Sequence, residues 1–440
     1  MPCGAFSFYE WCDMEGMDFN QIFAIVVFVV AIITIMSEKI HRTLVALAGT
    51  VILLIAHVLS FDTAISHIDF NTLGVLFGMM LFVAVVRESG LFEYLAVKTA
   101  KIAKGDPWRI MVLFVLLTAV LSAVLDNVTT VLLIGPMTLT ICKLLDINSI
   151  PFFMVEIMAS NIGGTATLIG DPPNIMIGSA AGYTFFDFIM YDTPIVLVIL
   201  VVIIALFYVM YGRKMKVNEE QRERVMQLVE REQIHDNRLM KQSVVMLAFV
   251  VLGFMLHGAI GVESSVIAMS AAALLLLISG RDITKALMHV EWTTLAFFAG
   301  LFVIVGGLAE TGTIDAIAQG LIDITGGNVF LTMIVLLFAS AIVSSFLDNI
   351  PFVATMIPIL LAMEATGMDV TPLWWAVSLG ACLGGNGTLI GASANVVLSD
   401  ISAKNGYTIS FVNYLKVGFP IMLLTVAISA VYLVLRFPPA

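Results

Sequence analysis

Leu125-Asp126-Asn127 stands inside a long apolar stretch of this chain, and Leu347-Asp348-Asn349 repeats it 222 residues later. Each copy leads into an apolar run that reaches a proline, Pro136 in the first copy and Pro358 in the second. The same spacing relates other residues of the two halves, namely Asp69 and Glu291, Thr72 and Thr294, Gly78 and Gly300, Glu88 and Glu310, and Gly90 and Gly312. The chain therefore contains an internal duplication. A carboxylate repeated in its most apolar part indicates ion chemistry, because an ionisable group is costly to bury there.

The composition is that of a membrane protein. Sixty per cent of the 440 residues are hydrophobic, 12% are charged, and the mean hydropathy is +1.04, whereas soluble proteins carry about 25% charged residues. Apolar windows of about 18 or more residues, each long enough to cross a bilayer, follow one another along the sequence. The first window, from Gln21 to Met36, has no basic residue before it. This argues against a cleaved signal peptide and for a retained helix.

We predict an all-α polytopic membrane protein made of two inverted repeats, each with about five spanning helices and one re-entrant hairpin. The first repeat covers residues 1–212, a charged linker covers 213–241, and the second repeat covers 242–440. The expected spans are 20–37, 43–60, 72–87, 151–186 and 193–212, then 242–258, 263–280, 293–309, 372–403 and 416–436. The expected hairpins, 107–145 and 328–364, each consist of two apolar segments that meet at the Asp-Asn pair.

The basic residues determine the predicted orientation. With the N-terminus outside, only Arg436 of the 21 lysines and arginines falls on the outer side, and lysine and arginine are enriched on the cytoplasmic side of membrane proteins. The linker then lies in the cytoplasm, and both termini lie on the outer side of the cell membrane. The first hairpin opens toward the cytoplasm and the second opens outward. The repeats are therefore related by a two-fold axis in the membrane plane, as in many secondary transporters.

A second motif also occurs in both repeats. It reads Asn-Ile-Gly-Gly-Thr-Ala-Thr-Leu-Ile-Gly-Asp-Pro-Pro-Asn over residues 161–174 and Leu-Gly-Gly-Asn-Gly-Thr-Leu-Ile-Gly-Ala-Ser-Ala-Asn over 383–395. Glycines and prolines at this density interrupt the hydrogen bonding of a helix. We therefore expect the helices of 151–186 and 372–403 to be broken, with free backbone groups that line a cavity. Close packing of the glycines against a neighbouring helix is the structural alternative.

Two hairpin tips and two broken helices would bring four helix ends together near the middle of the membrane, which suits a small ion or polar solute. Asp126 and Asp348 at the tips either cap the helices that follow or bind a proton or cation in one state and release it in another. Asp171 adds a third carboxylate, and because its counterpart is Ala392 the site is asymmetric. The predicted binding residues are Asp126, Asn127, Thr129, Gly163, Gly164, Thr165, Thr167, Asp171, Asn174, Asp348, Asn349, Gly384, Gly385, Asn386, Thr388 and Asn395.

Glu156 is a further carboxylate without an acidic counterpart, since Val377 takes its place in the second repeat. It is interpreted either as a proton relay or as a residue at the membrane interface. The chain has four cysteines without metal-ligand spacing, Cys3, Cys12, Cys142 and Cys382. They are either four free thiols or include one disulfide between Cys3 and Cys12. We expect no metal, no cofactor and no enzyme activity.

The hairpin tips, together with the first copy of the glycine motif, resemble the ion transporter superfamily that includes the divalent anion/sodium symporters. In the dicarboxylate members the tips read Ser-Asn-Thr, whereas Asp126 and Asp348 take the serine places here. The chain is therefore most similar to the branch of arsenite permeases, NhaD-type sodium/proton antiporters and the melanosomal P protein. The resemblance covers nearly the whole chain. It implies a homodimer with scaffold and transport domains and an elevator-like motion.

The carboxylates at the tips disfavour a dianionic substrate through direct repulsion. The leading hypothesis is proton-coupled efflux of arsenite or antimonite, as in arsenic resistance, because these metalloids are neutral trihydroxides near neutral pH. A sodium/proton antiporter is the first alternative, and a dicarboxylate-like carrier of organic or inorganic anions is the second. An ATPase subunit is a candidate partner, and no nucleic acid is expected.

Two other classes of protein are disfavoured. An intramembrane aspartyl protease also has two buried aspartates, but its Gly-x-Gly-Asp signature would need glycine at Leu168. The repeat symmetry explains the aspartate pair better. A passive channel is disfavoured because inverted repeats with titratable tips suit alternating access.

Overall fold

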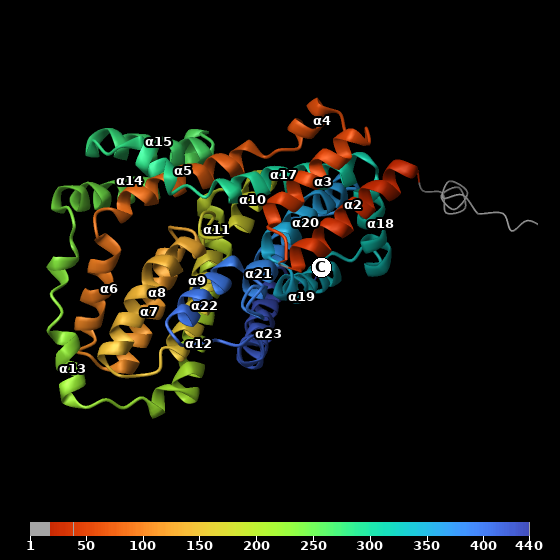
Figure 1. Cartoon of the computed structure of the whole chain (residues 1–440). Coiled ribbons are helices and arrows are strands. Elements are labelled where there is room, and N and C mark those ends of the chain that lie inside the picture. The colour runs from red at the N-terminus through yellow and green to blue at the C-terminus, as the bar shows by residue number, and fades with distance from the viewer. Residues whose placement is uncertain (1–17, 38, 440) are drawn as a thin grey trace, which may run out of the picture.

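The computed structural model describes residues 18–37 and 39–439, and all regular structure within them is helical (Figure 1). Cys3 and Cys12 lie outside the described residues. The helical architecture and its duplication confirm the predicted fold class. Within residues 18–37 and 39–439, eight helices are long and apolar enough to cross a membrane.

The two repeats consist of corresponding helices. The first contains α2 (Phe19–Met36), α3 (Arg42–Ile55), α4 (Phe61–Ser66), α5 (Phe70–Arg87), α6 (Leu91–Ile102), α7 (Pro107–Ser122), α8 (Asn127–Leu144), α9 (Ile150–Thr165), α10 (Pro172–Ala181), α11 (Phe185–Tyr191) and α12 (Thr193–Met210). The second contains α14 (Asn237–Ile260), α15 (Ser264–Ser279), α16 (Ile283–Met288), α17 (Trp292–Glu310), α18 (Thr313–Thr325), α19 (Val329–Phe346), α20 (Asn349–Ala365), α21 (Thr371–Gly384), α22 (Ser393–Lys404) and α23 (Phe411–Arg436). Thus α2 corresponds to α14, α10 corresponds to α22, and α11 with α12 corresponds to α23.

The hairpins and broken helices lie where the sequence predicts them. Helices α7 and α8 meet at Asp126, and α19 and α20 meet at Asp348. The first broken helix comprises α9 and α10, and the second comprises α21 and α22. The first ends at Ala181, earlier than the expected residue 186, because Gly182 takes a left-handed conformation with φ +70°. A new helix, α11, then begins after its cap at Thr184.

The helices form two groups (Figure 1). In the first helix group α2, α3, α5, α14, α15 and α17 pack mainly on one another, and they extend across the top of the view. The second helix group contains the hairpins and broken helices, with α7 against α9 and α19 against α21. Its centre is the most buried part of the chain, because every residue of α9 from Phe152 to Thr165 is buried. The groups meet where α5 contacts α10 and where α17 contacts α20.

The linker between the repeats is ordered and packs on the first repeat. It contains the short helices η1 (Gly212–Lys214), α13 (Glu219–Met226) and η2 (Glu230–Gln233). Lys101 of α6 donates to Glu230 at 2.6 Å, and Arg222 pairs with Asp106 at 3.2 Å. The hydrogen bond from the Lys101 ammonium holds the pKa of the Glu230 carboxyl below its ordinary value. These contacts hold the linker against one end of the first repeat.

Candidate functional site

Asp126 caps the helix of its own hairpin. Its carboxylate accepts the Thr129 backbone N–H at 2.7 Å and the Thr129 hydroxyl at 2.5 Å. These bonds satisfy groups that the first turn of α8 leaves free. Asp126 is half-buried and also lines a small cavity between the two helix groups. The capping interpretation therefore describes the contacts of Asp126, while its binding role stays a prediction.

Asp348 makes a wider set of contacts. It accepts the Ile350 N–H at 3.2 Å, and it also accepts the Ser393 hydroxyl at 2.8 Å. An ion pair with Arg42 Nη1 at 3.0 Å joins it to the first residue of α3. The Arg42 guanidinium also lies over the Phe297 ring, 5.0 Å from its centroid. This ion pair connects the two helix groups.

Asp171 of the first repeat bonds to the second repeat. Its carboxylate is fully buried between the two hairpin tips. Asn349 Nδ2 lies 3.2 and 3.1 Å from the two carboxylate oxygens, and Asn127 Nδ2 lies 3.4 Å from one of them. No lysine, arginine or histidine pairs with it among residues 18–37 and 39–439. One carboxylate from the first repeat is thus held by neutral amides from both repeats.

A chain of asparagine amides extends from this point into the second repeat. Asn161 accepts from Asn127 at 3.2 Å and donates to Asn386 at 3.0 Å and to Asn395 at 2.9 Å. Asn161 is not among the residues predicted from the sequence. One feature of the sequence could have identified Asn161. It is the first residue of the repeated motif, at the position that Cys382 takes in the second repeat.

Two asparagines brace the broken helices in the same way. Asn174 Nδ2 donates to the carbonyls of Thr165 at 3.1 Å and Thr167 at 3.0 Å. Asn395 Nδ2 donates to the carbonyls of Gly385 at 2.7 Å and Thr388 at 2.9 Å. Because a broken helix leaves carbonyls without partners, these side chains supply the missing donors. The braces preserve the unwound geometry of both motifs.

The predicted threonines of the broken helices donate their hydroxyls to backbone carbonyls. Thr165 donates to Asn161 O at 2.7 Å, and Thr167 donates to Ala123 O at 2.5 Å. Thr388 donates to the carbonyl of Ser345. The Thr167 and Thr388 hydroxyls hold the broken helices against the hairpins, whereas the Thr165 hydroxyl bonds within α9, and none of the three lines the small cavity.

The predicted glycines allow a close approach of helices. A Cβ added to Gly163 would lie 2.3 Å from Ala119 O, and one added to Gly384 would lie 2.7 Å from Ala341 O. Inside the first broken helix, a Cβ on Gly164 would lie 2.6 Å from the Gly170 carbonyl. Gly385 is tightly enclosed in the same way by the backbone of its own motif. The packing interpretation therefore accounts for these glycines, which lie behind the cavity and do not line it.

The small cavity has a volume of about 30 Å³. A water molecule occupies roughly 10–15 Å³ on this measure, so the cavity has room for about two. Its lining residues are Arg42, Leu76, Met80, Asp126, Asn127, Val128, Asp171, Pro172, Glu291, Thr294, Asn349, Ile350 and Ser393. Three carboxylates and one guanidinium therefore face a space of this size, and Asp348 lies directly behind the guanidinium. Glu291 was missed from the sequence, although its pairing with Asp69 was visible there.

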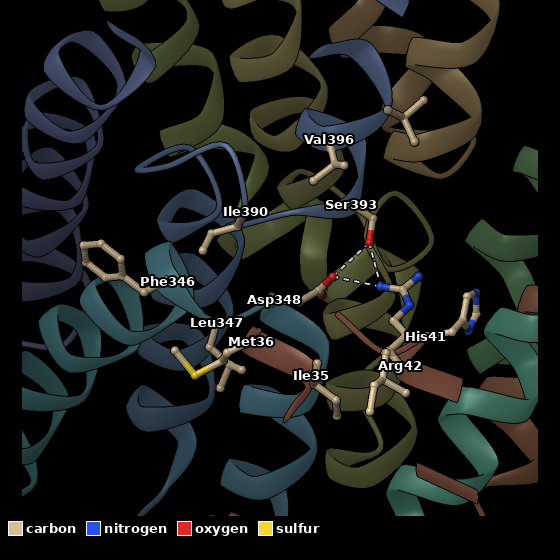
Figure 2. A pocket seen from close by; sticks show the side chains of 12 residues that line it. Ile35, Met36, His41, Arg42, Phe346, Leu347, Asp348, Ile390, Ser393 and Val396 are labelled. Carbon is tan, nitrogen blue, oxygen red and sulfur yellow. Dashed lines mark hydrogen bonds and ion pairs between the residues drawn. The ribbon is translucent and has the colours of Figure 1, made fainter. Parts of the chain in front are cut away.

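A larger cavity of about 300 Å³ lies on the other side of the ion pair (Figure 2). Figure 2 shows Arg42, Asp348 and Ser393 in one cluster, with Phe346, Ile390 and Val396 on the walls. Arg42 and Ser393 line both cavities. The ion pair therefore stands between the larger cavity and the carboxylates around Asp171.

Glu156 lies apart from the cavity. Its side chain is 1% exposed, and one carboxylate oxygen accepts the Thr138 hydroxyl at 2.5 Å. Glu156 is therefore enclosed within the protein, and both interpretations of it, as a proton relay and as a residue at the membrane interface, stay predictions. Cys142 and Cys382 are free and buried. No three His, Cys, Asp or Glu side chains of the described part of the chain are placed to hold a metal ion.

Comparisons with known proteins agree with this architecture. An uncharacterised transporter of Mycobacterium bovis is 43% identical over 424 residues, which cover 95% of this chain and 99% of that protein. The human P protein is 32% identical over 484 residues, which cover 91% of this chain and 58% of that protein. The YdaH transporter of Alcanivorax borkumensis has the same fold, with a TM-score of 0.56 and 18% identity over 86% of this chain and 88% of that one.

These relatives confirm the resemblance to the ion transporter superfamily, and they identify the chain as a membrane transport protein. The family model described as "Citrate transporter" (CitMHS) matches residues 32–380. The chain therefore belongs to the CitMHS citrate transporter family.

Proposed function

We propose that this protein is a proton-coupled secondary transporter of a small inorganic solute, and that Asp171 is the carboxylate that exchanges the coupling proton. The observation that carries this proposal is that both hairpin tips donate amides to one fully buried carboxylate. Neutral donors stabilise an ionised carboxylate less completely than a cation would. Asp171 is therefore free to take up a proton or a cation without breaking an ion pair.

The charges around the cavity support a cation as the exchanged solute. Asp126, Asp171 and Glu291 face about 30 Å³ of space together with a single arginine. Carboxylate oxygens are the preferred ligands of hard cations, and they repel a multiply charged anion such as citrate. We therefore place sodium/proton exchange first.

Efflux of a neutral metalloid such as arsenite is the second candidate. The amides of Asn127 and Asn349 support it, because they offer donors that a trihydroxide would accept, beside carboxylates that would accept its hydroxyl protons. An ATPase subunit as partner belongs to this candidate alone. A dicarboxylate-like anion carrier is third, since only Arg42 would offset the charge of its substrate.

The same proposal includes the way the protein moves. The second helix group would travel against the first in an elevator-like manner, carrying Asp171 between the two sides of the cell membrane. The larger cavity beside Arg42 would then open to the cytoplasm, because the predicted orientation places residues 37–42 on that side. A homodimer held through the first helix group completes this proposal.

Flux measurements in proteoliposomes test the proposal. An imposed pH gradient should drive sodium or arsenite movement in the wild type, and Asp171→Asn should lower the gradient-driven rate at least tenfold. Asp400→Asn is the matched control, because Asp400 is exposed and pairs only with Lys404 on its own helix. Citrate added in a third arm tests the anion alternative. Wild-type flux and proton dependence in Asp171→Asn would overturn the role of Asp171.

A further inference from the structure

Asp192 is a second buried carboxylate, and it lies outside the cavity described above. It stands at the junction of α11 and α12 and is 0% exposed. Its Oδ2 lies 2.7 Å from the Ser378 hydroxyl, while its Oδ1 has no hydrogen-bond partner among the described residues. No basic side chain pairs with it in the same part of the chain. An ionised carboxylate in such a place would be costly.

The hydroxyl of Ser378 also faces a second oxygen. It lies 2.8 Å from Asn174 Oδ1. The Asn174 amide cannot be turned over, because its Nδ2 donates to the carbonyls of Thr165 and Thr167, and an oxygen in that position would face two acceptors. Ser378 therefore stands between two oxygens, and Asn174 Oδ1 has no proton to give.

Counting protons determines the state of Asp192. A serine hydroxyl has one hydrogen, so with Asp192 ionised one of the two short O···O contacts would hold no hydrogen. With a proton on Asp192 Oδ2, Asp192 donates to Ser378, and Ser378 donates to Asn174, so every contact is satisfied. We infer that Asp192 holds a proton and is a second proton-binding site, linked to Asp171 through Ser378 and Asn174.

The remaining groups around Asp192 do not replace this proton. The Cys382 thiol of α21 donates a weak hydrogen bond to Asn174 Oδ1 at 3.5 Å, but it supplies no hydrogen to the short contact between Ser378 Oγ and Asn174 Oδ1 at 2.8 Å. The same thiol interacts electrostatically with both Asp171 and Asp192. On α23, Tyr432 interacts with Asp192 and donates its own hydroxyl to the backbone carbonyl of Tyr191 at 2.7 Å.

Arg436, the one basic group near this site, lies over the Tyr191 ring at 4.7 Å. It is partnered by an aromatic ring and forms no ion pair with Asp192. Among the described residues, the titratable groups that interact with Asp192 are therefore Cys382 and Tyr432, and Arg436 lies over the ring of the neighbouring Tyr191.

The second repeat shows why the proton is specific to the first. Asn395 braces its broken helix as Asn174 does, but its Oδ1 accepts from Asn161 Nδ2 at 2.9 Å, which is a true donor. Asn174 Oδ1 receives its short hydrogen bond from Ser378, which in our inference depends on the proton of Asp192, and only a weak one from the Cys382 thiol. Loss of that proton would set two acceptors against one hydroxyl and disturb the brace of the segment that carries Asp171. The proton on Asp192 thus acts on the geometry of the transport site.

Infrared difference spectroscopy of the purified full chain in lipid bilayers tests this inference. The wild type at neutral pH should show a carboxylic-acid C=O band that Asp192→Asn removes. Asparagine can donate to Ser378 as the protonated acid does, so this variant should fold. Asp400→Asn is the control and should leave the band in place, because Asp400 is exposed and forms an ion pair with Lys404, away from Ser378 and Asn174.

A second variant keeps the test independent of how well Asp192→Asn folds. Ser378→Ala removes the group to which Asp192 donates, so the same band should shift in frequency. A spectrum that neither variant changes would show that Asp192 is ionised, and the inference would fail. The inference rests on the proposed function only for its consequence in transport. If Asp171→Asn transported normally while the Asp192 band remained, the proposed function would fail and the proton on Asp192 would stand.

Discussion

The two hairpin tips have the same sequence but different surroundings. Asp126 bonds to Thr129 within its own hairpin, whereas Asp348 bonds to Arg42 and Ser393 on other elements. Asp126 therefore stabilises only the helix that follows it. The second tip is fastened to the first helix group by an ion pair.

The two aspartates make different contacts because the residues around them differ, since the tips themselves have the same Leu-Asp-Asn sequence. Counterparts by the repeat spacing are Ser264 for Arg42, Pro172 for Ser393 and Pro351 for Thr129. In an inverted repeat, the oppositely facing state would bring the first tip to the place that the second occupies here. Ser264 could offer no charge to Asp126 there. If the protein alternates between two oppositely facing states, as we propose, the ion pair would stabilise only one of them.

The largest effect should come from removing one member of the ion pair. Asp348→Ala leaves the Arg42 guanidinium without its partner at a site where the two side chains are 28% and 14% exposed. We expect a loss of about 2 kcal/mol in stability, less than for a fully buried pair. Thermal unfolding in detergent measures this loss. Arg42→Gln combined with Asp348→Asn should recover most of it, and a double variant as unstable as Asp348→Ala would contradict an ion-pair role.

The amides beside the tips should also differ. Asn349 donates at 3.1 and 3.2 Å to both oxygens of Asp171, whereas Asn127 donates at 3.4 Å to one. Because a hydrogen bond to a charged group contributes about 1.5–3 kcal/mol, Asn349→Ala should lower proton-driven flux by roughly tenfold or more. Asn127→Ala should lower it only severalfold. Equal losses in proteoliposomes would mean that the two tips contribute equally.

Opening the ion pair should change access to the small cavity. Arg42→Gln should raise the labelling rate of a cysteine introduced at Val128, which lines that cavity, by about tenfold. A cysteine at Val396 is the control, because it lines the larger cavity and should react equally in both backgrounds. Arg42→Lys, which keeps the charge, should label like the wild type. Unchanged labelling at Val128 would show that the ion pair does not control access.

The sequence was sufficient for the features that local residues determine. Glycines and prolines break a helix wherever they stand, so the motif that ends at Asn174 predicted its own unwinding, and the repeated tip predicted the hairpins. Contacts between distant elements could not be read in this way. Arg42 looked like an ordinary cytoplasmic arginine, because its partner Asp348 lies 306 residues further on. Asp192 was not identified from the sequence, because its contact with Ser378 joins residues 186 positions apart.

The smallest effect on stability should come from Asp126→Asn, and this variant separates the two interpretations of the first tip. Asparagine caps a helix about as well as aspartate, and its Oδ1 can still accept the Thr129 N–H. The unfolding temperature should therefore change little, because the expected loss is under about 0.5 kcal/mol. If Asp126 only caps α8, proton-driven flux should be unchanged as well. If it also contributes charge to the cavity that it shares with Asp171 and Glu291, sodium-dependent flux should fall severalfold at unchanged stability, because one of three carboxylates facing the cation is neutral. A loss of flux without a loss of stability is thus the result that gives the first tip a role in binding.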